Sequence, residues 1–121
     1  MLISRQDVCQ KLRLQKRTSY RIIGTSRHIS YINTNDILAI INKARRNIKE
    51  PLMYIPSDLR TPDEMAGEID GIKPKDLKTW VQRRTKNVPP HFRFNKHTTR
   101  FSAKLLKDWI DNNTHIREAK K

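Results

Sequence analysis

The chain has 121 residues, of which 36% are hydrophobic, and it carries a formal net charge of +14. This length suits one ordinary domain or two very small ones, with modest cores rather than a deep active-site scaffold. The charge is shared evenly, because residues 1–58 hold 11 Lys and Arg against 4 Asp and Glu, and residues 59–121 hold 15 against 8. Both halves therefore favour a polyanionic partner, of which nucleic acid is the commonest.

The sequence also argues against several other classes of protein. A single cysteine, Cys9, cannot form an internal disulfide, and the longest apolar run, residues 37–41, is too short to cross a bilayer. The N-terminal residues do not resemble a secretory signal peptide, so we expect a cytoplasmic protein with no membrane partner. No Cys/His spacing predicts a zinc site, and no P-loop, GxSxG or HExxH motif is present. We therefore expect no metal, no cofactor and no enzymatic activity.

Residues 2–41 and 59–110 predict the same succession of elements: helix, turn, helix, hairpin, helix. The first helix begins at Ser4 in one copy and at Thr61 in the other, each followed three residues later by a carboxylate, as in a capping box. Apolar pairs at helical spacing recur at the same offset of 57, namely Val8 with Leu12 and Met65 with Ile69.

A second helix is predicted over Lys16–Ile23 and over residues 74–85. The β signals follow, around residues 29–31 in the first copy and over 91–101, with a polar tip at 95–97, in the second. The alternation of Phe92, Phe94 and Phe101 predicts that all three are core residues on one face, with base stacking as the alternative. Third helices capped by Asn33 and Ser102 complete the copies.

The joining segment contains an apolar stretch, residues 52–55, between Pro51 and Pro56. We expect this stretch to be an extended strand that pairs with a wing. The predicted organisation is a first module over residues 1–50, a linker or strand over 51–58, a second module over 59–113 and a polar tail over 114–121.

Two segments of the second copy resemble a known family. Residues 89–94 and 100–110, which include Phe94, Phe101 and Trp109, resemble the wing and third helix of excisionase-like DNA-binding proteins, which are close to the MerR-type winged-helix fold. Residues 2–8 and 16–23 are similar to it as well, although the first copy lacks the aromatic-rich wing and the tryptophan. The duplicated organisation of a small basic chain is also similar to that of TraN-type accessory proteins of Gram-positive conjugative plasmids.

The repeat and the resemblance together predict a mainly α fold with small antiparallel β wings. We expect two tandem winged helix-turn-helix modules that form an internal pseudo-dimer. The chain would then act as a monomer with internal pseudo-two-fold symmetry, doing the work of a dimer in other helix-turn-helix proteins.

In a helix-turn-helix the second helix enters the major groove, so its exposed polar residues are candidates to contact DNA. A solvated basic helix face is the alternative. In the first module these candidates are Lys16, Arg17, Thr18, Tyr20 and Arg21. In the second they are Lys75, Lys78, Thr79, Gln82, Arg83 and Arg84. The wings add Arg27 and His28, and Arg93, Lys96, His97 and Arg100.

The predicted function is sequence-specific binding of double-stranded DNA by a small regulatory or accessory protein of a mobile element. Conjugative transfer, excision and transcription control all use the same DNA-holding chemistry, so the sequence leaves them open. The main alternative is a protein-interaction adaptor that recruits a recombinase or relaxase, with DNA contact secondary, and RNA binding is a third possibility. Since Asp76 and Leu77 stand where the first copy has Thr18 and Ser19, the two second helices should read different bases.

Overall fold

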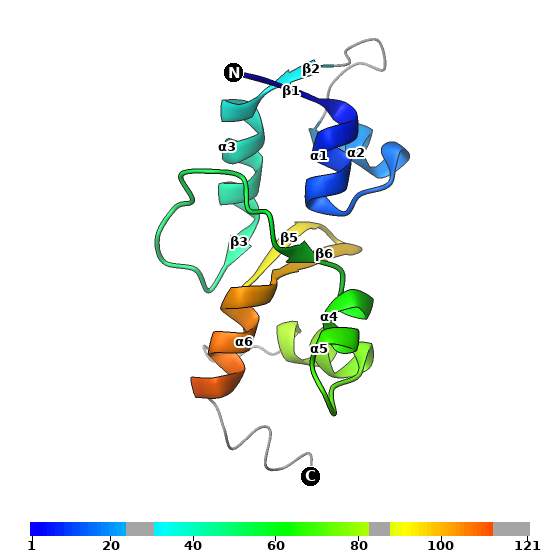
Figure 1. Cartoon of the computed structure of the whole chain (residues 1–121), viewed down its shortest axis with the longest axis vertical. Helices are drawn as coiled ribbons and strands as arrows, with labels where there is room; N and C mark the ends of the chain where they lie inside the picture. The colour runs from blue at the N-terminus through cyan, green and yellow to red at the C-terminus, as the bar shows by residue number, and fades with distance from the viewer. Residues whose placement is uncertain (24–30, 83–87, 113–121) are drawn as a thin grey trace.

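The computed structural model describes residues 1–23, 31–82 and 88–112, which form six helices and two small antiparallel sheets (Figure 1). The first half contains β1 (Leu2–Ser4), α1 (Arg5–Leu12), α2 (Lys16–Ile23), β2 (Tyr31–Asn33) and α3 (Thr34–Ala44). The rest of the described chain contains β3 (Arg45–Arg46), β4 (Leu59–Arg60), α4 (Pro62–Glu68), α5 (Pro74–Val81), β5 (His91–Asn95), β6 (Thr98–Ser102) and α6 (Ala103–Asn112). None of the described helices is long and apolar enough to cross a membrane.

Short polar side chains begin the helices where the sequence predicted them. Thr61 and Glu64 form a full capping box at α4: the Thr61 hydroxyl accepts from the Glu64 amide at 3.1 Å, and the Glu64 carboxylate accepts from the Thr61 amide at 2.9 Å. Ser4 accepts from the Asp7 amide at 3.1 Å at the start of α1. Each cap satisfies amides that a first helical turn leaves without partners.

A strand precedes the first helix of each half, which the sequence patterns did not predict. Leu2 of β1 pairs with Asn33, which caps α3, and Leu59 of β4 pairs with Ser102, which precedes α6. The hydrogen bonds beside these pairs also correspond, because the Thr34 amide donates to the Met1 carbonyl at 2.9 Å and the Ala103 amide donates to the Asp58 carbonyl at 3.0 Å. The two halves therefore share this strand register and the order of their three helices. β2 pairs with β1, and among the described residues of the first half no strand corresponds to β5; the rest of the predicted first wing, residues 24–30, lies outside the described residues.

The strand that we expected at residues 52–55 is absent from the described chain, so that prediction was wrong. The strands that flank the hairpin are β3 and β4, in the order β3-β5-β6-β4. Asn42 of α3 explains the difference, since its amide nitrogen donates to the Leu52 carbonyl at 3.1 Å and its amide oxygen accepts from the Leu52 N–H at 2.6 Å. These two bonds occupy the backbone groups that a strand would need for pairing, while the side chains of Leu52 and Ile55 pack against the first core.

The four-stranded sheet lies between two hydrophobic cores and contributes to both. Phe92 and Leu59, both fully buried, belong to the first core with Val8, Leu12, Ile37 and Ile41. Phe101 belongs to the second core with Met65, Leu77, Trp80 and Leu106. Phe92 and Phe101 are thus core residues, as predicted, but they face different cores rather than one, and Phe94 is only partly buried against the first core.

The two halves meet through different surfaces, so the expected pseudo-two-fold symmetry was wrong. In the first half the contact is made by α1 and α3, and in the second half by the sheet, since α1 packs on β4 and α3 packs on β5. The corresponding sheet of the first half, β1 with β2, lies at the far end of the molecule (Figure 1). A two-fold axis would require the same patch on both halves, whereas here the halves are stacked head to tail.

Candidate nucleic-acid interface

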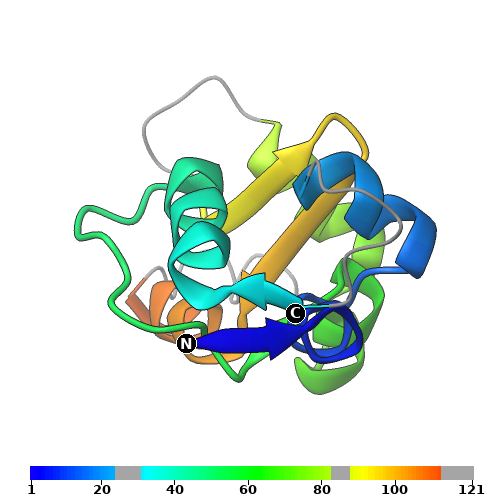
Figure 2. The same ribbon diagram turned by 90° about the horizontal axis from the view of Figure 1, so that it is seen from above.

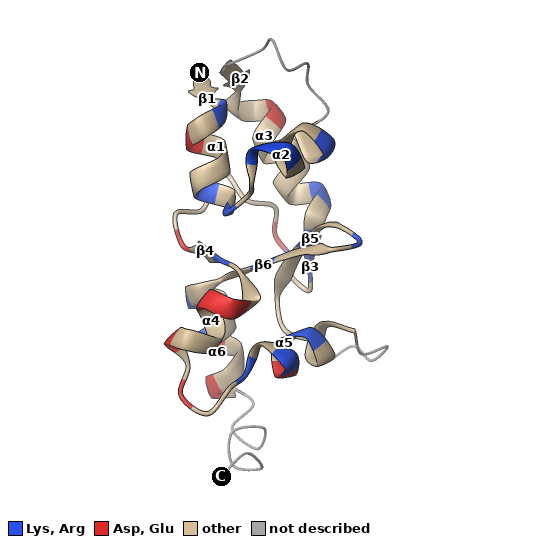
Figure 3. Ribbon diagram, turned by 90° about the vertical axis from the view of Figure 1, so that its right-hand side faces the viewer, with Lys and Arg blue, Asp and Glu red and all other residues tan. Residues whose placement is uncertain are grey.

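Three basic elements lie along one side of the molecule: α2, the tip of the β5–β6 hairpin and α5. Figure 3 shows them one below another, and Figure 2, seen from above, places them on the side opposite the loop that follows β3. We call this surface the basic stripe. Its exposed polar residues are Lys16, Arg17, Arg21, Lys75, Lys78, Thr79, Gln82, Arg93, Lys96 and His97.

In the first half, α2 is held against α1 by Arg5, a buried residue at the start of α1. The Arg5 guanidinium donates to the Ser19 hydroxyl at 3.4 Å and lies 4.4 Å from the centre of the Tyr20 ring. Ser19 is fully buried, and Tyr20 is half-buried beneath this contact. Tyr20 and Thr18, both half-buried, are therefore less accessible to a partner than the exposed cations of α2.

In the second half, α5, the hairpin and the start of α4 enclose a groove of about 460 Å³. Lys78 and Gln82 of α5 line it together with Arg93, Lys96 and His97 of the hairpin. These residues come from two parts of the chain that only the tertiary structure brings together. The groove offers guanidinium, ammonium, amide and imidazole groups and one carboxylate, that of Asp63, within one concave surface. Its cations outnumber this acidic group, so the set remains suited to phosphate oxygens and base edges.

His91 lies in the wall of this groove and is only 4% exposed. Burial lowers the pKa of His91, and the positive charges of Arg46 and Arg93 lower it further, against the opposing effect of its hydrogen bond to Pro89. The Nδ1 atom lies 2.8 Å from the Pro89 carbonyl, which can only accept, so Nδ1 carries the proton in the neutral ring. The groove wall is therefore neutral at this position near pH 7.

Arg100 has a different environment from the other predicted site residues of the hairpin. Its guanidinium donates to the carbonyls of Leu12 and Arg13 at the end of α1, at 3.0 Å and 2.7 Å. It therefore joins the two halves and stabilises the C-terminal end of a helix, where cations are favoured. Four other predicted residues, Arg27, His28, Arg83 and Arg84, lie outside the described residues.

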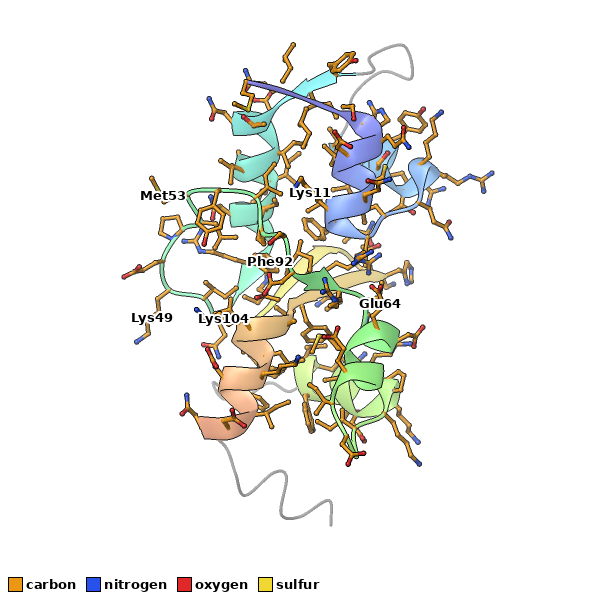
Figure 4. The ribbon with its side chains drawn as sticks, in the orientation of Figure 1. Lys11, Lys49, Met53, Glu64, Phe92 and Lys104 are labelled. Carbon is orange, nitrogen blue, oxygen red and sulfur yellow. The ribbon has the colours of Figure 1, made fainter. Side chains whose placement is uncertain are left out.

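Asp63 of α4 is exposed at the groove, whereas the other two carboxylates of this helix, Glu64 and Glu68, are engaged with neighbouring groups. Glu68 forms ion pairs with Arg60 at 2.9 Å and Lys107 at 3.4 Å. The hydrogen bond from the Thr61 amide lowers the pKa of Glu64, and the charge of Arg13 adds to this effect. Glu64 lies on α4 below the contact between the halves (Figure 4). Glu64 and Glu68 thus cap a helix and pair with neighbouring cations.

The structure also displays two apolar side chains that sequence reasoning did not single out as functional. Met53 and Tyr54 are 83% and 74% exposed, on the loop that Asn42 anchors through Leu52. Figure 4 shows Met53 on the side of the molecule away from α2. Their neighbours Leu52 and Ile55 are packed inward, and the pattern of four consecutive apolar residues did not show which two would be exposed.

The chain was compared with protein-family models, with curated proteins and with solved structures, and none of the three comparisons gave a match.

Proposed function

We propose that this protein binds double-stranded DNA at specific sequences through two tandem winged helix-turn-helix units. In this proposal α2 and α5 enter the major groove, and the β5–β6 hairpin is a wing that contacts the backbone or the minor groove. The observation that carries the proposal is that three elements with exposed basic residues, α2, the hairpin tip and α5, lie along one side of the molecule (Figure 3). Arg100 is left out of the proposed contacts because its donors bind α1.

The chemistry of the stripe supports base reading as well as phosphate binding. Arg17 and Arg21 are exposed on α2, and a guanidinium can bind guanine O6 and N7 with two hydrogen bonds. Gln82 is exposed at the end of α5, and a side-chain amide matches the adenine edge in the same way. Lys96 at the hairpin tip is suited to a phosphate. We further propose, on the resemblance given above, a regulatory or accessory role on a mobile element.

The test is a selection of bound fragments from random duplexes with the purified full chain, followed by a salt titration of the enriched duplex. We expect one enriched sequence and a steep loss of affinity with salt, with roughly 6–10 phosphate contacts contributing to the slope. A flat salt dependence, or no enrichment over random DNA, would count against the proposal. Enrichment of single-stranded or RNA competitors in the same selection would favour RNA binding instead.

A second candidate function is that of an adaptor, which the exposure of Met53 and Tyr54 favours. Large apolar side chains held outward on an anchored loop are typical of protein contacts. The variant Met53→Ser/Tyr54→Ser should keep DNA affinity but lose binding to a recombinase or relaxase that the unmodified chain binds. If the double variant bound such a protein as well as the parent does, the adaptor function at this loop would be wrong.

A further inference from the structure

We propose that the two halves bind DNA subsites that run in the same direction along the duplex, so that the bound site has the layout of a direct rather than an inverted repeat. This inference rests on the proposed function and adds an orientation to it. It follows from the way in which corresponding elements of the two halves are related in space.

The correspondence between the halves is set residue by residue. Leu2 and Leu59 hold equivalent places, because each pairs with the residue that precedes the third helix of its half. In the turn after the first helix, Arg13 has a φ of 55° and Gly71 a φ of 81°, so both turns pass through the left-handed region. The helices that follow these turns, α2 and α5, are therefore the corresponding second helices.

The exposure of corresponding residues shows that the contact between the halves is not reciprocal. Leu59 is fully buried against the first half, whereas its counterpart Leu2 is 66% exposed. Arg100 binds the end of α1, whereas its counterpart Tyr31 is 61% exposed. In Figure 1 the sheet strands lie above the helices in both halves, β1 and β2 above α1 and α3, and β4 and β6 above α4 and α6. The same end of each half therefore points up, so one half is carried onto the other by a movement along the long axis with a turn about that axis, and not by a two-fold rotation across it (Figures 1 and 2).

This relationship decides how two recognition helices meet a duplex. When helices are related by a two-fold axis, they read inverted half-sites on opposite strands, as in dimeric helix-turn-helix proteins. Helices related by a shift along an axis, with or without a turn about that axis, keep the same direction along it and so approach a parallel duplex with the same polarity. Since α2 and α5 both lie on the basic stripe (Figure 3), one duplex along the long axis would meet them in the same direction.

The base sequence of the site cannot by itself reveal this direction, because α2 and α5 carry different side chains. The direction can be revealed by cutting the DNA from a reagent attached beside each recognition helix and comparing which strand is cut, and on which side of each subsite. We suggest tethering a hydroxyl-radical-generating iron chelate at Gln15→Cys or at Lys73→Cys, in a Cys9→Ser background. These two exposed positions correspond at an offset of 58, just before α2 and α5, and neither is a proposed DNA contact. The duplex is the one enriched by the unmodified full chain.

We expect the two cleavage patterns to superimpose after a slide along the duplex, with each strand kept in its place. Patterns that superimpose only after the two strands are exchanged would overturn the direct arrangement while leaving DNA binding intact. If the selection enriches no duplex, the proposed function itself fails and this inference fails with it, so the two failures are distinguishable.

Discussion

The side chains of Arg100 and Arg13 link the two halves of the protein, because each donates hydrogen bonds to backbone carbonyls of the opposite half. The Arg100 guanidinium donates to the Arg13 carbonyl at 2.7 Å, and the Arg13 guanidinium donates to the Leu59 carbonyl at 3.2 Å. Arg13 also lies 3.7 Å from the Glu64 carboxylate. Two residues that are 87 positions apart in sequence therefore close the polar rim of a contact whose centre is apolar.

Replacing Arg100 should destabilise the whole protein. In Arg100→Ala the carbonyls at the end of α1 lose a charged donor in a half-buried place, which costs about 1–3 kcal/mol of unfolding free energy. Arg93→Ala is the matched control, because Arg93 is exposed on the neighbouring strand, and we expect a change within about 0.5 kcal/mol. Urea denaturation measures both. Equal losses in the two variants would contradict the structural role of Arg100.

The first half should not fold without the second. A fragment of residues 1–50 lacks Leu59 and Phe92, which are fully buried in the first core. We expect this fragment to show little helicity by circular dichroism and poor dispersion of its amide resonances. In the full chain, Phe92→Ala should cost about 3–5 kcal/mol of unfolding free energy. A well-dispersed spectrum from the fragment alone would mean that the shared sheet is not required.

Stability should fall when the pH is lowered through the ordinary range of histidine. Burial lowers the pKa of His91 in the folded state, so the unfolded chain takes up the proton more readily. The stabilisation is present above the unfolded pKa of about 6.5 and is lost as the pH falls through the lower folded pKa. We expect His91→Gln to flatten the decline in unfolding free energy between about pH 7.5 and 5.5. A decline as steep in this variant as in the parent would assign the effect to other groups.

Cations on the two sides of the molecule should differ in their effect on DNA binding. Lys16→Ala and Lys78→Ala, both on the basic stripe, should each lower the slope of log affinity against log salt by about 1 if that lysine contacts a phosphate. Lys49 and Lys104 lie on the opposite side (Figure 4), and their alanine variants are the controls. They remove the same charge and should leave the slope unchanged. A uniform effect of all four would mean that only net charge matters.

Local signals in the sequence were sufficient for the helices and the β5–β6 hairpin, but not for the strands β1, β3 and β4. The caps at Ser4 and Thr61 were predicted because each one acts on amides within three residues, so that sequence distance and spatial distance nearly coincide. The hairpin over 91–102 followed from its alternation and polar tip. The strand expected at 52–55 failed because its apolar pattern fits a packed loop as well, and Asn42, ten residues earlier, decides between them.

What the sequence by itself determined was the repeated order of three helices, the positions of the helix starts and the basic character of both halves. Each of these features depends on residue type and on short spacings, both of which can be read from the sequence. Only the tertiary structure decided that Phe92 and Phe101 face different cores, that Arg100 binds α1 and that the halves stack head to tail. These features depend on which apolar surface covers which other surface, and residues far apart in the chain make that choice through the free energy of burying both together.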